Sequence, residues 1–198
     1  MTAMTYSRYL HLKELLALQH PLTPPEQEDL CDSERLFIVV HQASEILLGQ
    51  ALTDLRHLEA NQCGARCFRY RAERATRLID ALEGHLTLLR QTLDPADFLR
   101  FRDLFGTASG MQSAQFHELF ELTERLPAMD IGHSAATELR DAVRRWRRTH
   151  LQLVQYMIGN QPGSGETSGL RYLARRLNGK ASGEIAGCPV GALPRTRS

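Results

Sequence analysis

Apolar residues recur along residues 135–159 at alternating intervals of four and three positions. This spacing returns to the same face of an α-helix, so the segment is predicted to be a long helix with one face turned toward a core. One position of that face is His150 rather than an apolar residue. A core histidine either hydrogen-bonds to a neighbour or offers a lone pair to a metal ion, and this segment alone leaves both interpretations open. The inward-facing positions are Leu139, Val143, Trp146, His150, Leu153 and Met157.

Residues 26–61 show the same periodicity. The letters LFIVV within this segment are also typical of a strand, but the longer repeat favours a second long helix. A histidine, His41, again occupies the inward-facing row. Two histidines on the core faces of two long helices favour a metal or cofactor site over two separate structural histidines. The row consists of Phe37, His41, Ser44, Leu48, Ala51, Leu55 and Leu58.

Residues 67–93 are predicted to form a third long helix, whose apolar row has no polar interruption and indicates a scaffold. Cys63 and Cys67 flank its start. Their Cys-x3-Cys spacing is weak evidence for a metal site and is more typical of free thiols. Three long amphipathic helices without an alternating strand pattern predict an all-α helical bundle.

A shorter helix is predicted after Asp94, which is a good N-cap residue followed by proline at the first helical position. It brings Phe98, Arg102 and Phe105 to one face. An arginine on an aromatic face either reaches the surface with its charged end or, if buried, requires an anion. Ser109 is the predicted N-cap of the following helix, with Gln112 as its capping-box partner.

The two ends of the chain have simpler patterns. Residues 5–19 are predicted to form a packing helix or an arm that crosses to a neighbouring subunit, and Tyr6 and Tyr9 share one of its faces. Residues 160–169 form a glycine-rich polar segment, which is either a connector or a loop whose backbone N–H groups approach an anion. We expect residues 1–179 to form a single domain and residues 180–198, which include Cys188, to be a loosely ordered tail.

Composition narrows the class of protein. The 198 residues carry a formal net charge of +1, which gives no argument for nucleic-acid binding. No signal-peptide pattern precedes the four cysteines, so we expect them to be free thiols and the protein to be cytoplasmic. No apolar run looks long enough to span a membrane.

The inward-facing residues favour haem among the possible cofactors. A di-iron site is disfavoured because no Glu-x-x-His pair lies on facing helices. Zinc is disfavoured because the pattern shows no Cys/His cluster, and a Ser-His-Asp hydrolase lacks a nucleophile elbow. Haem needs one axial histidine and an apolar slot, and its propionates suit the arginines and the glycine-rich loop.

Four segments, in order, resemble signatures of the tryptophan 2,3-dioxygenase family. The start YSRYLHLKELLALQHPL resembles Y-x-x-Y-L-x-L-x-x-L, and ERLFIVVHQASE resembles L-F-I-x-x-H-Q-x-x-E-L. DFLRFRDLFGTASGMQSAQF resembles F-x-x-F-R-x-x-L-x-x-A-S-G-F-Q-S-x-Q-F. WRRTHLQLVQYMIGNQPGSGETSG resembles W-R-x-x-H-x-x-M-V-x-x-x-I-G-x-x-x-G-T-G-G-S-S-G. Together these matches cover most of residues 5–177.

The resemblance implies a histidine-ligated haem between long helices and assigns a role to each matched residue. His150 is the implied axial ligand of haem b iron, and His41 the distal histidine that hydrogen-bonds the indole N–H. Phe37 packs on the indole, and Arg102 binds the substrate carboxylate. Further substrate-binding residues are Phe98, Phe105, Ser109, Ser164 and, from a neighbouring subunit of a homo-oligomer, Tyr6, Tyr9 and Leu10. Residues implied to contact the haem are Trp146, Ser109, Gly110, Gly163 and Gly165.

The implied reaction inserts O2 into the C2–C3 bond of the indole of tryptophan or a related aromatic amino acid. Departures from the family pattern keep alternatives open. The stretch between AQFHELF and Trp146 is short, where family members carry extra helices, and Phe105 replaces a smaller side chain. One alternative is a haem monooxygenase or peroxygenase that hydroxylates a substituted indole or a tyrosine in secondary metabolism. Others are a non-catalytic haem sensor and a plain helical interaction module, and the oligomer is a tetramer or a dimer.

Overall fold

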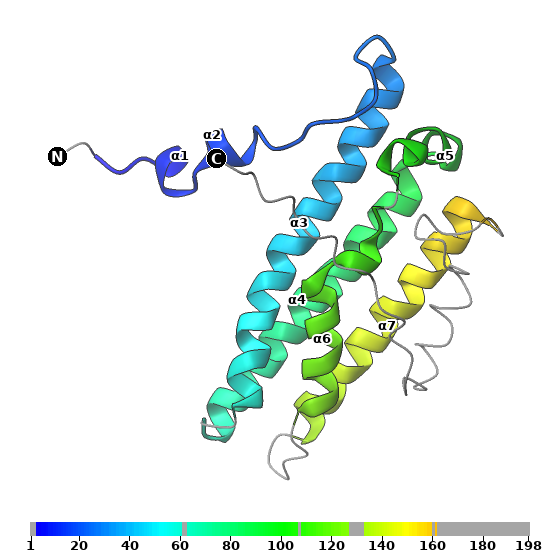
Figure 1. Ribbon diagram of the computed structural model, residues 1–198. Helices are drawn as coiled ribbons and strands as arrows, with labels where there is room; N and C mark the ends of the chain where they lie inside the picture. Colours follow the sequence, from blue (N-terminus) through cyan, green and yellow to red (C-terminus); the bar gives the residue numbers. More distant parts are fainter. Residues whose placement is uncertain (1–2, 61–62, 107, 127–132, 160, 162–198) are drawn as a thin grey trace, which may run out of the picture.

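The computed structural model describes residues 3–60, 63–106, 108–126, 133–159 and 161 (Figure 1). Every regular element within these ranges is a helix, which confirms the predicted all-α class. The predicted tail, residues 180–198, and the glycine-rich segment after Pro162 lie outside the described residues. The α-helices are α1 Tyr6–Tyr9, α2 Leu12–Leu15, α3 Glu28–Glu59, α4 Ala65–Thr92, α5 Pro95–Arg102, α6 Ala114–Arg125 and α7 His133–Ile158, and two short 3-10 turns are η1 Asp103–Phe105 and η2 Gly110–Gln112.

The three long helices and α6 lie side by side as a bundle, and α4 packs against both α3 and α7 (Figure 1). Helix α6 lies against α3 and α7, and α5 lies at the other end of the bundle. The uninterrupted apolar row of α4 accounts for its central place, because its inward side chains are almost completely buried. These side chains are Phe68, Ala72, Ala75, Ile79, Leu82, Leu86 and Leu89.

The predicted helix limits agree closely with the structure. Asp94 caps α5, where its carboxylate accepts a hydrogen bond from the Ala96 N–H at 2.7 Å. Helix α7 ends before Gly159, whose φ of +56° is the left-handed conformation that glycine adopts at helix C-termini. These two ends depend on local chemistry, so the sequence predicts them well.

The prediction that Ser109 begins α6 is wrong. Ser113 is the N-cap, and its hydroxyl accepts a hydrogen bond from the Phe116 N–H at 3.3 Å. The turn η2 lies between the two serines, and Gln112 still reaches back to the Ser109 N–H at 3.3 Å. Both serines are suitable N-cap residues, but Ser109 alone of the two has the glutamine of a capping box, and Gly110 disfavours continuing a helix from Ser109.

The N-terminal segment forms two helices of four residues instead of the single predicted helix. His11 lies between them with a φ of +51°, which breaks the helical path. Figure 1 shows this arm extending away from the bundle. The segment that joins the arm to α3 is held by Glu34, a buried carboxylate on α3. It accepts hydrogen bonds from the Leu22 N–H at 2.8 Å and the Thr23 N–H at 2.7 Å.

Helix α3 corrects the expectation that no apolar run is long enough to span a membrane. By length and composition alone it could cross a membrane, with a mean hydropathy of 1.3 over its most apolar window. Core helices of folded bundles have the same property. Ten residues of α3 are buried against the rest of the described chain, and 22% of its most apolar window is buried.

Candidate functional site

A cavity of about 130 Å³ lies among α3, α4, α6 and α7. It is walled mainly by apolar side chains, and the polar groups on its border come from α3, α6 and α7. The apolar lining consists of Val40, Leu86, Leu89, Gly110, Phe116, Phe120 and Trp146, and the polar lining of His41, Ser44, Glu45, His117, Arg147 and His150. The structure therefore brings His41, Trp146, His150 and Gly110 together as the sequence analysis expected.

His150 is held by an aromatic stack within α7 and α6. Its imidazole is parallel to the Trp146 indole, with ring centroids 5.2 Å apart and an interplanar angle of 4°. The Phe116 ring also stacks on the Trp146 indole, with ring centroids 4.5 Å apart. Burial, with a smaller contribution from the charge of His41, lowers the pKa of His150 to about 4. His150 is therefore neutral at pH 7 and carries a lone pair that can bind a metal ion.

His41 is a neutral hydrogen-bond acceptor facing the same cavity. Its Nδ1 lies 2.7 Å from the Phe37 carbonyl oxygen, and because a carbonyl only accepts, Nδ1 carries the proton. The lone pair is then on Nε2. His41 is an exposed residue that borders the cavity, and desolvation by the surrounding protein atoms lowers its pKa while the Phe37 carbonyl and Glu45 partly offset the shift. An N–H group in the cavity would find an acceptor at His41 Nε2.

An aromatic cluster adjoins the cavity through Phe37 and His41, whose ring centroids are 4.0 Å apart. Phe37 also contacts Phe98 at 5.6 Å and Phe105 at 5.5 Å. The guanidinium of Arg102 lies 6.0 Å from the centre of the Phe98 ring and is half-buried. The predicted face of Phe98, Arg102 and Phe105 therefore lies next to Phe37, beside the residues that line the cavity.

The remaining predicted site residues lie in three different parts of the chain. Ser109 is half-buried and precedes Gly110, which borders the cavity. Tyr6 and Tyr9 lie on the N-terminal arm and are 75% and 71% exposed, and Leu10 is 39% exposed. Ser164 and its glycine neighbours Gly163 and Gly165 lie outside the described residues.

The sequence analysis assigned no role to several residues that border the site. The most informative is Arg147, whose guanidinium carbon lies 3.8 Å from the centre of the Phe120 ring and places a positive charge at the cavity. Arg147 is the arginine of the W-R-x-x-H pattern, so the signal was present. Phe101 was also missed, although it is fully buried and contacts Phe37 at 5.7 Å.

A second group of possible metal ligands lies elsewhere in the bundle. His57, Cys63 and Cys67 form a cluster, which corrects the expectation that the chain has no Cys/His cluster. The sequence pattern did not reveal it because the histidine belongs to α3 and Cys67 to α4, and only the turn between these helices joins them.

Comparison with known proteins identifies the family. Residues 1–126 match the family described as tryptophan 2,3-dioxygenase. A tryptophan 2,3-dioxygenase of Kineococcus radiotolerans is 38% identical over 262 aligned positions, which cover 88% of this chain and 86% of the relative. A tryptophan 2,3-dioxygenase of a Ruegeria species (strain TM1040) is 31% identical over 254 positions, covering 89% of this chain and 88% of the relative. The chain belongs to the tryptophan 2,3-dioxygenase family.

Within the tryptophan 2,3-dioxygenase family, this chain is short. The alignment to the Ruegeria protein spans 254 positions, but 89% of 198 residues is about 176 residues, so roughly 78 positions of that alignment have no residue from this chain. The family match ends at Leu126, where α6 has just finished. Both findings agree with the predicted shortening between α6 and Trp146.

Because the pKa values of His41 and His150 are lowered, the free energy of unfolding of the haem-free chain should depend on pH. In an unfolded chain a histidine binds a proton below about pH 6.5, whereas folded His150 does so only below about pH 4. Between these values the unfolded state binds more protons, so the free energy of unfolding should fall as the pH falls, by at most about 1.4 kcal/mol per pH unit for each histidine. The loss should level off below the folded pKa.

Urea unfolding at a series of pH values between 7 and 4 measures this slope. A His150→Gln variant is the matched control, because it should show a shallower slope over the same range. Equal slopes in the two proteins would show that the cavity does not keep His150 neutral.

Proposed function

We propose that this chain is a haem-dependent oxygenase that inserts O2 into the indole C2–C3 bond of tryptophan, or of a closely related aromatic amino acid, to give the N-formylkynurenine type of product. The observation that carries the proposal is the pair of neutral histidines, His41 and His150, on one aromatic-walled cavity. Membership of the tryptophan 2,3-dioxygenase family supports the reaction type.

The donor set fits haem b. His150 offers a neutral imidazole for iron, the leucines of α4 and the rings of α6 and α7 offer an apolar slot, and Arg147 offers a cation for a propionate. The cavity of about 130 Å³ is smaller than the roughly 300–1,000 Å³ of most ligand pockets. Haem would therefore require the side chains that wall the cavity to move apart. Bound haem iron would supply the O2 chemistry, and the chain would supply binding and orientation.

The chain's own residues would orient the substrate. His41 Nε2 is the acceptor for the indole N–H, which fixes the ring in the cavity without requiring a charge. Phe37 packs beside it, with Phe98 and Phe105 completing an aromatic wall. Arg102, at the rim of that wall, binds the substrate carboxylate, because a guanidinium can donate two parallel hydrogen bonds to it.

The resemblance extends the proposal to residues beside the cavity and beyond the described ranges. Ser109 and Gly110 would lie against the haem edge, and Gly110 borders the cavity. Ser164, with Gly163 and Gly165, would receive the substrate ammonium and a haem propionate. The support for these last three roles is the sequence resemblance alone.

We also propose a homo-oligomer, a tetramer or a dimer, in which Tyr6, Tyr9 and Leu10 close a neighbouring subunit's pocket. The support is their exposure on an arm that extends from the bundle (Figure 1). A cytoplasmic location is supported by the free thiols of Cys31, Cys63 and Cys67.

Haem binding can be measured through the chain's single tryptophan, Trp146, which stacks on His150. Titration of haem into the haem-free chain is expected to quench Trp146 fluorescence in proportion to a growing Soret band, with a break at one haem per chain. Haem that binds without quenching would place it outside this cavity. After reduction under air, added L-tryptophan is expected to yield N-formylkynurenine, and its absence would contradict the proposed reaction.

A further inference from the structure

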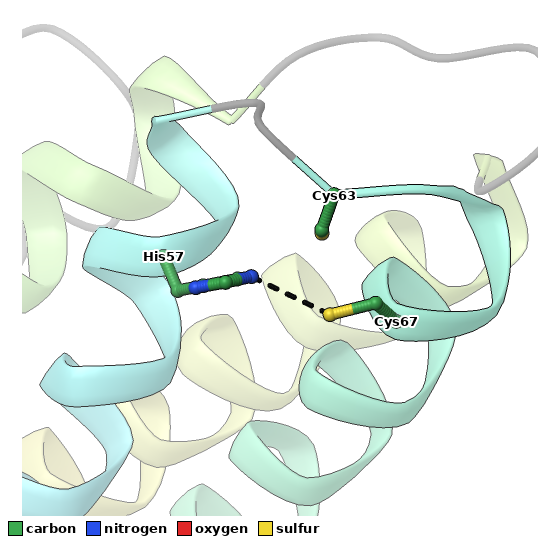
Figure 2. A group of neighbouring side chains, drawn as sticks. All are labelled: His57, Cys63 and Cys67. Atoms are coloured by element: carbon green, nitrogen blue, oxygen red, sulfur yellow. Dashed lines mark hydrogen bonds between the residues drawn. The ribbon is translucent and has the colours of Figure 1, made fainter.

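Three side chains with soft or borderline metal-binding atoms meet where α3 ends and α4 begins (Figure 2). His57 lies in the last turn of α3, Cys63 immediately precedes the N-cap Gly64, and Cys67 lies in the first turn of α4. The three ligand atoms, one imidazole nitrogen and two sulfurs, all lie within 4.8 Å of one another. The Cys67 sulfur is 3.4 Å from His57 Nε2.

These separations match the dimensions of a zinc site. Zinc binds cysteine sulfur at about 2.3 Å and histidine nitrogen at about 2.0–2.1 Å in tetrahedral geometry. Tetrahedral angles then put a nitrogen and a sulfur ligand about 3.6 Å apart, and two sulfur ligands about 3.8 Å apart. The observed distance of 3.4 Å between His57 and Cys67 is close to the first of these values. All three side chains are half-buried, and α3 carries His57 and α4 carries Cys67, while Cys63 lies in the turn between them.

We propose that His57, Cys63 and Cys67 bind one Zn²⁺ ion, which fastens the end of α3 to the start of α4. Two thiolates neutralise the charge of the ion, and thiolate with imidazole is a ligand set that selects Zn²⁺ over Mg²⁺ or Ca²⁺. The bound ion links residues that are ten positions apart along the chain and so stabilises the turn between two long helices.

Two features of the surroundings act on the cluster in opposite directions. Burial and the hydrogen bond with Cys67 raise the pKa of the Cys63 thiol, whereas the N-terminus of α4, where Gly64 provides no side-chain cap, attracts negative charge. Arg71, one turn after Cys67, donates a hydrogen bond to Asp54 at 2.8 Å, and its guanidinium also interacts with Cys67. Asp54 pairs with Arg74 as well, so its carboxylate offsets part of the positive charge beside the cluster.

The fourth ligand would be water. A shallow hollow borders Cys67, lined by residues 64–67, Tyr70 and Arg71, and gives solvent access to that side of the cluster. The cluster is remote from the histidine cavity: His57 is sixteen residues beyond His41 on α3, which corresponds to about 24 Å at the helical rise. Zinc binding and haem binding can therefore succeed or fail independently.

The test uses the full chain, freed of metal by a chelator and kept under a thiol-free reductant. It is dialysed against buffered Zn²⁺, and zinc and iron per chain are measured by mass spectrometry. We expect one zinc per chain, and zinc-edge X-ray absorption should show two sulfurs at about 2.3 Å. At zinc concentrations about 100-fold above the dissociation constant, the midpoint of thermal unfolding should rise by about 5–10 °C.

Variants assign the ligands. Cys67→Ser and His57→Ala should each weaken zinc binding at least about tenfold, which would remove about half or more of the thermal shift at the same zinc concentration. Cys31→Ser and His150→Ala are the matched controls, which remove a described cysteine and histidine outside the cluster and should leave zinc binding unchanged. Circular dichroism establishes that each variant is folded.

Three results would overturn the proposal. The first is a wild-type chain that does not bind zinc under these conditions. The second is unchanged zinc affinity in Cys67→Ser and His57→Ala. The third, which does not depend on any variant folding, is an X-ray absorption spectrum of the bound zinc without two sulfur neighbours.

Discussion

Replacing His150 with alanine is expected to leave the purified chain with less than about a tenth of the haem that the wild-type chain retains. His150 is the neutral imidazole stacked on Trp146 at the cavity, and its loss would remove the proposed axial ligand while leaving the apolar walls in place. The measurement is haem per chain by the pyridine haemochrome absorbance, with circular dichroism to establish that the bundle is intact. Added imidazole should restore part of the haem content, because it can occupy the space left by the side chain.

Two other histidines serve as controls, since both border the same cavity. His117 on α6 is exposed and has no proposed role, so His117→Ala should retain haem and turnover. His41→Ala should retain haem but lose turnover, because the indole N–H loses its acceptor. Wild-type haem content in His150→Ala would show that His150 is not the axial ligand.

Replacing Arg102 with alanine is expected to weaken L-tryptophan binding by about 10- to 150-fold. A hydrogen bond to a charged group contributes roughly 1.5–3 kcal/mol, and about 1.4 kcal/mol corresponds to a factor of ten. The dissociation constant can be read from the shift of the Soret band on titration with L-tryptophan. Tryptamine, which lacks the carboxylate, should bind the variant and the wild-type chain with similar affinity.

Arg100 offers the matched control on the same helix. It is exposed and reaches Asp97 and Gln27 at the surface, so Arg100→Ala should leave the L-tryptophan affinity unchanged. If Arg102→Ala binds L-tryptophan and tryptamine in the same ratio as the wild-type chain, then Arg102 does not bind the carboxylate.

Helix geometry explains what the sequence alone could predict. The spacing of four and three residues places His41 and His150 on core faces, because the twist of a helix is local and the same everywhere. The chemistry at a helix end is equally local, as Asp94 and Gly159 show. The limits of the long helices and the inward direction of both histidines were therefore predictable.

Contacts between helices were harder to predict, because they depend on how the helices are aligned. The stack of Phe116 on Trp146 joins α6 to α7, and the cluster of His57 with Cys63 and Cys67 joins α3 to α4. Neither follows from the periodicity of one segment. The start of α6 shows a second limit, since the capping box of Ser109 with Gln112 favoured Ser109 although the helix begins after Ser113.

The roles of Arg102 and Phe37 were inferred from the family resemblance and not from helix geometry. Periodicity placed Arg102 on an aromatic face but left open whether it pointed to solvent or to an anion. The structure adds the aromatic cluster around Phe37 and its contact with His41, which puts this face beside the cavity. The substrate-binding role of Arg102 still follows from the family resemblance and awaits the binding measurement above.

The most direct test of the proposed reaction is turnover of L-tryptophan under ¹⁸O2 by the reduced, haem-loaded chain, with the product analysed by mass spectrometry. The account predicts N-formylkynurenine that carries two labelled oxygen atoms. A product with one labelled atom would contradict insertion of O2 and indicate hydroxylation. No labelled product from L-tryptophan, in a chain that binds haem, would contradict the proposed activity itself.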